Sequence, residues 1–87
     1  MRYTVGWSAS AQSELAEVWL EATDRDAVSA ASNEIDTFLA VSPNDPRCEV
    51  VAGAGILIIG PLGVEFRIRE RDRFVVVVNA WKVTSED

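Results

Sequence analysis

Apolar and polar positions repeat with two different periods along the chain, and each change of period marks a predicted element. Near the N-terminus, Tyr3, Val5 and Trp7 alternate with polar or small residues. This is the period of two expected of a half-buried strand, so a strand is predicted over residues 2–7. Ser8, which follows it, has a side chain suited to cap a helix. The sequence therefore opens with a strand that leads directly into a helix.

Two helical patterns follow, separated by a short polar break at Thr23 and Asp24. In residues 9–22 the apolar side chains recur on one face of a helix. Asp24 can cap a second helix, and from there to about Ala40 a narrower apolar stripe recurs, with several alanines beside it. Small side chains let two helices approach closely, and a short loop favours an antiparallel helical hairpin. The prolines in residues 42–46 end the second helix.

The second half of the chain is rich in β-branched residues, and the period returns to two. Residues 50–59 are apolar on both alternating sets near Ile56–Ile59, which favours a central strand, and Gly53 and Gly55 weaken it and indicate a bulge. A turn is predicted at residues 60–63, a strand at 64–69, a second turn at 70–73 and a last strand at 74–83. Short connections between successive strands imply an antiparallel meander of three strands.

The elements together predict one α+β domain over residues 1–87. An N-terminal strand, an antiparallel helical hairpin and a three-stranded antiparallel meander are expected, with the helices packed on one face of the sheet and the first strand at one edge. A chain of 87 residues has room for one core. No apolar run reaches the roughly 18 residues of a membrane span, and no signal peptide is evident. A cytoplasmic protein without a membrane partner is therefore expected.

Charge is distributed unevenly along the chain, whose net charge is −6. Residues 1–49 hold nine acids and three bases, whereas residues 50–87 hold five of each. Four of the bases lie close together: Arg67, Arg69, Arg71 and Arg73. This balance disfavours nonspecific binding of nucleic acid. Any contact with an anion has to be local.

Several kinds of chemistry are excluded or disfavoured by composition. The chain has no histidine and a single cysteine, Cys48. The commonest general base and metal ligand is therefore absent, and Cys48 is interpreted as a spare thiol in a loop or at a strand edge. Gly53, Gly55 and Gly60 do not fit a phosphate-binding loop, because no helix follows them and Pro61 stands where lysine is needed. No cofactor and no metal are expected.

Two further groups of side chains have structural interpretations. One is a row of carboxylates at helical spacing: Glu14, Glu17 and Glu21. We interpret this row as a solvated helix face rather than a metal or acid–base site. The other is the set of tryptophans: Trp7, Trp19 and Trp81. We expect these large side chains to pack in the core, because a small domain needs their area.

Arg67 and Arg69 are the strongest candidates for a binding site. They project from the side of the predicted strand opposite its apolar residues. If the helices cover the apolar side, both arginines lie on the open face of the sheet. Guanidinium groups there can bind phosphate or pair with the nearby Glu65, Glu70 and Asp72. Local ion pairing is the preferred interpretation.

Several segments resemble the RelE/ParE toxins, a superfamily that includes plasmid stabilisation proteins. Residues 3–8, followed by Ala11 and Leu15, look like the family's opening, a strand that runs into W-S-x-x-A-x-x-x-L. Residues 64–68 are similar to its penultimate strand, and residues 74–81 look like its last strand. The resemblance covers nearly the whole chain.

The resemblance implies the toxin of a type II toxin–antitoxin pair, neutralised by an antitoxin protein that wraps around it. RelE-type members cut mRNA on the ribosome, and ParE-type members poison DNA gyrase. Cleavage of the RelE type uses several basic residues and often a tyrosine. The residues carried over from the family are Arg67 and Lys82, and Arg69, two residues after Arg67, is a further candidate. Gly63 stands where an active member carries arginine, and the only tyrosine is Tyr3.

Three hypotheses follow, and the residues leave open whether the chain is an enzyme. The first is a toxin-family protein that acts mainly by binding proteins: an antitoxin and, as a cellular target, gyrase. The second is a ribosome-dependent mRNA endoribonuclease in which Arg67, Arg69 and Lys82 share the open face of the sheet. The third is a non-toxic interaction module that forms a homodimer through a long apolar strand such as residues 74–78.

Overall fold

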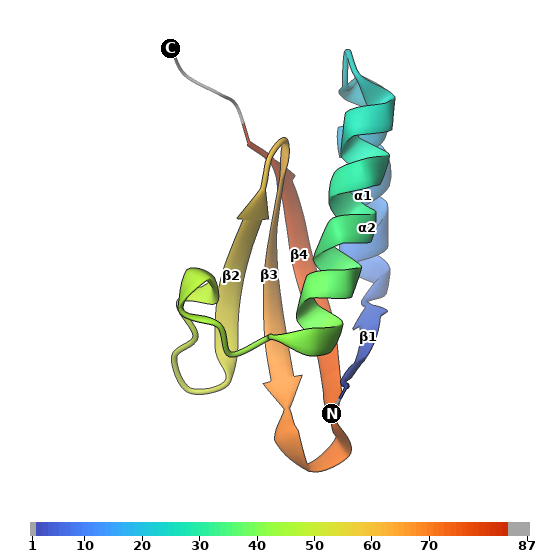
Figure 1. Ribbon diagram of the computed structural model, residues 1–87. Helices are drawn as coiled ribbons and strands as arrows, with labels where there is room; N and C mark the ends of the chain where they lie inside the picture. The colour runs from blue at the N-terminus through green and yellow to red at the C-terminus, as the bar shows by residue number, and fades with distance from the viewer. Residues whose placement is uncertain (1, 84–87) are drawn as a thin grey trace.

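The computed structural model describes residues 2–83, which form two helices packed on one face of a four-stranded sheet (Figure 1). The elements are β1 (Thr4–Trp7), α1 (Ala9–Glu21), α2 (Arg25–Val41), η1 (Pro46–Cys48), β2 (Ala54–Ile59), β3 (Leu62–Arg69), η2 (Glu70–Asp72) and β4 (Phe74–Lys82). The strand order is β1-β4-β3-β2. This confirms the predicted α+β architecture. The meander is antiparallel, whereas β1 pairs with β4 in parallel, so the sheet is mixed.

Both helices begin at the capping residues that the sequence predicts. Ser8 Oγ accepts a hydrogen bond from the N–H of Ala11 at 3.1 Å at the start of α1. Asp24 Oδ1 accepts one from the N–H of Ala27 at 3.1 Å at the start of α2. These bonds satisfy N–H groups that the first turn of a helix leaves without a partner inside the helix. The caps therefore set where the hairpin starts and where it turns.

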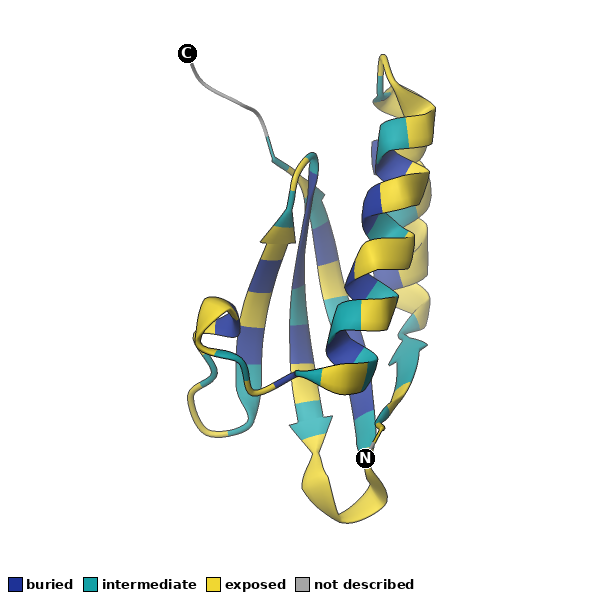
Figure 2. Cartoon of the chain, viewed as in Figure 1, coloured by how far each residue is buried: buried dark blue, intermediate teal, exposed yellow. Residues whose placement is uncertain are grey.

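The core lies between the helical layer and the sheet. Buried residues alternate with exposed ones along β2, and they form one stripe along α2 (Figure 2). The largest fully buried side chains are Phe66, Ile35, Leu39, Leu57, Leu62, Val28, Val64, Val75 and Val77. The buried side chains of the strands and those of α2 therefore pack together in one apolar layer.

The glycine in β2 marks a close approach and not the predicted bulge. A Cβ at Gly55 would lie 2.8 Å from the ring of Phe66 and 2.9 Å from the carbonyl oxygen of Cys48. Gly55 therefore makes room for the largest buried side chain. The irregularity of the sheet lies elsewhere, in β4, where Val78 is the extra residue of a register shift.

β2 and β4 occupy positions different from those that their apolar runs suggest. The prediction of a central strand at residues 50–59 is wrong, because β2 is shorter and forms an edge of the sheet. The suggestion that residues 74–78 pair edge to edge is also wrong, because β4 lies between β1 and β3. Ile56 and Ile58 are 45% and 51% exposed. β2 carries apolar side chains on both faces, but only the face under the helices is covered, and Ile56 and Ile58 lie exposed on the other face.

The turn between β2 and β3 is shorter than predicted. β3 begins at Leu62, which is fully buried and pairs with Ile59. Gly63 follows on the opposite face, where a Cβ would lie 2.7 Å from the indole of Trp81. Trp81 therefore lies on the open face above Gly63 and is only half-buried. The expectation that it packs in the core is wrong.

Cys48 belongs to the core and is not a spare thiol at a strand edge. It sits in η1, as part of the loop that the sequence predicts, and its side chain is fully buried. Burial raises the pKa of the Cys48 thiol, and the charge of Asp45 raises it further. The thiolate is the reactive form of cysteine. The structure therefore assigns Cys48 a packing role.

Candidate functional site

The structure separates the three basic residues that the sequence suggests as a site. Arg67 and Arg69 lie exposed on the open face of β3. Lys82 pairs with Leu62, whose side chain is buried under the helices. Directly paired residues point to the same face of a sheet. Lys82 therefore faces the helical side, where it lines a small pocket with Pro61 and the end of the helical hairpin. The expectation that all three share the open face is wrong for Lys82.

The bulge in β4 accounts for the position of Lys82. Val77 before the bulge and Ala80 after it are both buried, with the extra residue Val78 between them. The extra residue therefore reverses which side of the sheet each later residue of β4 faces. Without the bulge, Lys82 would point to the same face as Phe74. With the bulge, Lys82 points to the face of the sheet opposite Arg67 and Arg69.

The only tyrosine is held in a polar cluster just before the start of β1. Tyr3 donates a hydrogen bond from its hydroxyl to Glu70 Oε1 at 2.8 Å, and Asn44 Nδ2 donates to Glu70 Oε2 at 3.0 Å. The hydrogen bond to Glu70 raises the pKa of Tyr3, and the bonds from Asn44 and Tyr3 lower the pKa of Glu70. The guanidinium of Arg73 lies 5.5 Å from the Tyr3 ring. Tyr3 therefore serves as a neutral donor that ties β1 to η2.

The open face around the two arginines offers anion binding more readily than acid–base chemistry. Glu65, the carboxylate between Gly63 and Arg67 on this face, accepts a hydrogen bond from Asn79 Nδ2 at 2.7 Å. Guanidinium groups bind phosphate well, but they remain protonated and cannot take a proton from a hydroxyl. Arg67 and Arg69 can therefore hold an anion, whereas a general base has to come from another group.

Within residues 2–83, no group of three or more His, Cys, Asp or Glu side chains is arranged to hold a metal ion. In the same range, neither helix combines the length and the apolar character needed to span a bilayer.

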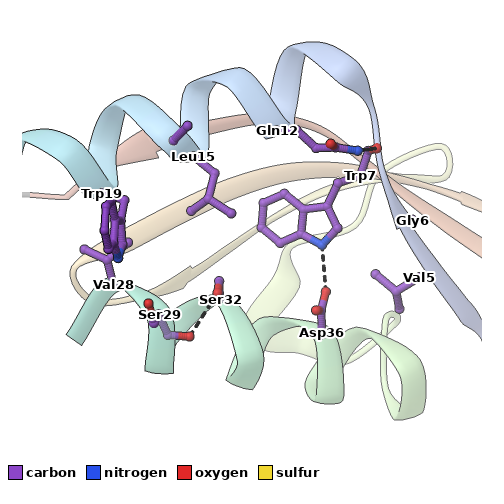
Figure 3. A pocket seen from close by; sticks show the side chains of 11 residues that line it. Val5, Gly6, Trp7, Gln12, Leu15, Trp19, Val28, Ser29, Ser32 and Asp36 are labelled. Carbon is purple, nitrogen blue, oxygen red and sulfur yellow. Dashed lines mark hydrogen bonds between the residues drawn. The ribbon is translucent and has the colours of Figure 1, made fainter. Parts of the chain in front are cut away.

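A groove of about 550 Å³ lies between α1 and α2, beside the end of β1 (Figure 3). The apolar side chains of its lining are Val5, Trp7, Leu15, Ala16, Trp19 and Val28. The polar part consists of Gln12, Ser29, Ser32 and Asp36. Large apolar side chains beside a few polar groups are typical of a binding site. No pattern along the sequence reveals this groove, because its residues come from three separate elements.

Trp7 lies between the two helices and is held on two sides. Its indole Nε1 donates a hydrogen bond to Asp36 Oδ1 on α2 at 2.7 Å (Figure 3). Its carbonyl oxygen accepts one from Gln12 Nε2 on α1 at 2.9 Å. The end of β1 is thereby bonded to both helices. Trp7 is half-buried, and it packs against the core, as expected, while it also lines the groove.

Trp19 lies on the rim of the groove and is 39% exposed. The guanidinium of Arg25 sits 4.7 Å from its ring centroid and donates to its carbonyl oxygen at 3.1 Å. Val18, the preceding residue, points into the core, so Trp19 falls about 100° further round the helix. The expectation that Trp19 is a core residue is therefore wrong. Leu20 beside it is 59% exposed.

Glu14 has a structural role that its spacing does not reveal. Its Oε1 accepts a hydrogen bond at 2.8 Å from the N–H of Ala80 in β4. β1 runs beside β4 only as far as Trp7. Beyond that point the N–H of Ala80 needs a hydrogen-bond acceptor from α1, and Glu14 supplies it. The interpretation of the acidic row as a solvated face is therefore wrong for Glu14. Glu17 and Glu21 are exposed, as expected.

The groove lies in the acidic half of the molecule. α1 and α2 together carry six acidic side chains and one basic side chain, Arg25. One of the acids, Asp36, is part of the groove lining. A ligand that enters between the helices therefore meets negative potential around an apolar wall.

No protein-family model and no curated protein sequence matches the chain. Solved structures do match it. A chain from the toxin–antitoxin complex RelBE2 of Mycobacterium tuberculosis has a TM-score of 0.75 and 18% identity, and the match covers 94% of this chain and 92% of that chain. A chain from the chromosomal ParDE toxin–antitoxin system of P. aeruginosa has a TM-score of 0.70 and 14% identity, with 94% and 97% covered. Likeness at these identities establishes a shared fold.

Proposed function

We propose that this chain, which has a RelE/ParE-like toxin fold, is the toxin-family component of a type II toxin–antitoxin pair and acts by binding proteins. The observation that carries the proposal is the likeness, over 94% of the chain, to chains of two toxin–antitoxin systems. From those systems we infer an antitoxin partner for this chain as well.

The groove between the helices supports binding of a partner helix. An amphipathic helix docks by placing apolar side chains one turn apart into a groove. Trp7 and Trp19 provide large and rigid contact surfaces, and such residues dominate the binding energy of many interfaces. We infer that the antitoxin inserts apolar side chains between α1 and α2.

The charge of the helices indicates the chemistry of that partner segment. With six acidic side chains and one basic side chain on α1 and α2, a docking segment with lysine or arginine beside its apolar anchors is favoured. Interactions between exposed charges are screened by salt, over about 10 Å at 0.1 M. Binding in the groove should therefore weaken as the salt concentration rises.

Protein binding agrees better with the described side chains than RNA cleavage does. Lys82 lies on the helical side, Tyr3 is engaged with Glu70, and the sequence has no histidine. A ribonuclease needs a general base and a general acid at the scissile phosphate. Gyrase is therefore the cellular target that we propose to test first, because a gyrase poison requires a binding surface only.

One observation favours the alternative, a ribosome-dependent mRNA endoribonuclease. Arg67 and Arg69 are exposed on the same face of β3, two residues apart. This arrangement suits the binding of a phosphate backbone. The two functions are distinguished by their dependence on these arginines.

The experiment induces the chain alone and together with the product of the adjacent reading frame. We expect growth arrest on induction alone, relief on co-expression, and a stable complex of the two proteins. Arrest that persists in the triple variant R67A/R69A/K82A supports protein binding. Loss of arrest together with loss of mRNA cleavage in that variant supports the ribonuclease. Failure of the two proteins to co-purify, with no arrest on induction, contradicts the toxin proposal.

A further inference from the structure

β2 presents unpaired backbone groups along one edge of the sheet. The N–H of Ile68 donates to the carbonyl oxygen of Gly53 at 2.7 Å, which sets the register of hydrogen bonds between β2 and β3. In an antiparallel pair, successive residues bond alternately to the neighbouring strand and away from it. The N–H and C=O groups of Ile56 and Ile58 therefore point out of the sheet.

Ala54, the first residue of β2, confirms this alternation. Its N–H and C=O groups point out of the sheet, as those of Ile56 do, and they bond to Val51, so this end of the edge is already occupied. The N–H of Val51 donates to the carbonyl oxygen of Ala54 at 2.8 Å, and the reverse bond is 3.0 Å. Pairing with another strand is thus possible at Ile56 and Ile58, beyond the segment that covers Ala54.

The η1 loop packs against β2 and bonds at Ala54, but the edge at Ile56 and Ile58 lacks the other devices by which proteins protect exposed strands. Residues 54–59 contain no charged residue and no proline, and their register with β3 is unbroken. The opposite edge is treated differently. β1 is four residues long, and Glu14 covers the β4 N–H group beyond it. The edge at β1 is therefore short and partly covered, whereas the edge at β2 keeps two residues, Ile56 and Ile58, that can pair.

We propose that two copies of the chain associate by antiparallel pairing of β2 with β2, about a two-fold axis at Leu57. Ile56 then lies opposite Ile58 of the second copy, and Ile58 opposite Ile56 of the second copy. Both residues have outward N–H and C=O groups, so each opposed pair can exchange both hydrogen bonds. A two-fold interface must be self-complementary, and the register of β2 meets this condition.

The side chains at this edge fit the same arrangement. Ile56 and Ile58 are 45% and 51% exposed on the open face, where exposed bands mark β2 (Figure 2). Pairing would set the isoleucines of the two copies against one another, beside Trp81 where it lies over Gly63. Cross-strand contacts of this kind stabilise antiparallel pairs. Association would therefore cover apolar side chains as well as backbone groups.

Charge favours this edge over the helical side as the surface where two identical copies meet. Residues 50–87 carry equal numbers of acids and bases, whereas residues 1–49 carry the net charge of −6. Each copy repels the other through its acidic half, and salt screens that repulsion. Self-association should strengthen as salt rises, which is the opposite of what we infer for the partner groove. The proposal does not depend on the antitoxin assignment.

The test measures the mass of the full chain by sedimentation over a concentration series at low and high salt. A short interface of this size falls in the weak class, so we expect a concentration-dependent dimer. Ile58→Pro removes one outward N–H that the intramolecular ladder does not use, and proline is tolerated at a sheet edge. Ile56→Lys adds a charge to the same edge. Each variant should weaken dimerisation at least tenfold.

Controls separate this pairing from other kinds of association. Thr4→Lys places a lysine on the opposite edge and should leave the dimer intact. Circular dichroism shows whether each variant is folded, and amide exchange should show protection of Ile56 and Ile58 that rises with concentration. A monomer at every concentration overturns the proposal, as does a dimer lost in Thr4→Lys but kept in Ile58→Pro. Protection of these amides by the adjacent gene product alone, with no self-association, also overturns it.

Discussion

The hydrogen bond between Trp7 and Asp36 joins β1 to α2 and forms the polar end of the groove, so its removal tests the described site directly. The variant is Asp36→Ala. In the native protein, Trp7 Nε1 donates to Asp36 Oδ1 at 2.7 Å, and the bond is partly buried. Loss of the carboxylate leaves the indole N–H without its acceptor and removes one of the links between the edge strand and the second helix.

The expected destabilisation follows from two opposing terms. A hydrogen bond to a charged group contributes about 1.5–3 kcal/mol, and the lower value applies because water can enter the groove. Alanine is the better helix former and returns up to about 0.7 kcal/mol. The net loss is therefore about 1 kcal/mol, against a total stability of roughly 4–13 kcal/mol for a chain of 87 residues.

The assay is urea unfolding followed by circular dichroism. With a slope of about 1 kcal/mol per molar urea for a small protein, the midpoint of Asp36→Ala should fall by about 1 M. Asp36→Asn keeps a neutral acceptor and should fall between that variant and the wild type. Glu34→Ala changes an exposed residue of the same helix and serves as the matched control. Equal midpoints for Asp36→Ala and Glu34→Ala would refute the described arrangement of Trp7.

Three further predictions concern packing, pH and the buried thiol. Gly55→Ala should destabilise by about 1–3 kcal/mol through overpacking against the ring of Phe66, whereas a Cβ at Gly60 meets open space and Gly60→Ala should leave the thermal midpoint nearly unchanged. The pKa of Glu70 is lowered below its ordinary value of 4.5. Its contribution to stability is therefore present above that pH and is lost as the pH falls through the folded pKa. Glu70→Gln should remove this part of the acid dependence in urea midpoints measured from pH 3 to 6. Cys48 is fully buried, so an aromatic disulfide reagent should label it only at the rate at which the domain opens, and immediate labelling of the native protein would contradict its place in the core.

The sequence was most informative where a pattern depends on neighbouring residues. Ser8 and Asp24 identified both helix starts, because a cap acts within its own first turn. The alternation of Val64 and Phe66 with charged residues identified β3 and its buried face. The fold class followed from these local signals together with the short connections between strands.

The errors concern features that depend on distant residues. Residues 75–78 are all valine, so polarity does not reveal the bulge at Val78, and the bulge decides which face Lys82 occupies. Glu14 looks like its exposed neighbours, because the N–H that it satisfies is left free by the shortness of β1 relative to β4. The groove likewise exists only where β1 meets both helices. Spacing along one element contains no information on any of the three.

Titration of the purified chain with the purified product of the adjacent reading frame tests the central claim most directly. Ser29→Trp places a large side chain at an exposed position of the groove, and Ala30→Trp adds a similar volume at the next exposed position, outside it. Calorimetry should show a stable complex that weakens at high salt, at least tenfold weaker binding for Ser29→Trp, and nearly unchanged binding for Ala30→Trp. Absence of binding, or equal affinity for the two variants, would contradict the account.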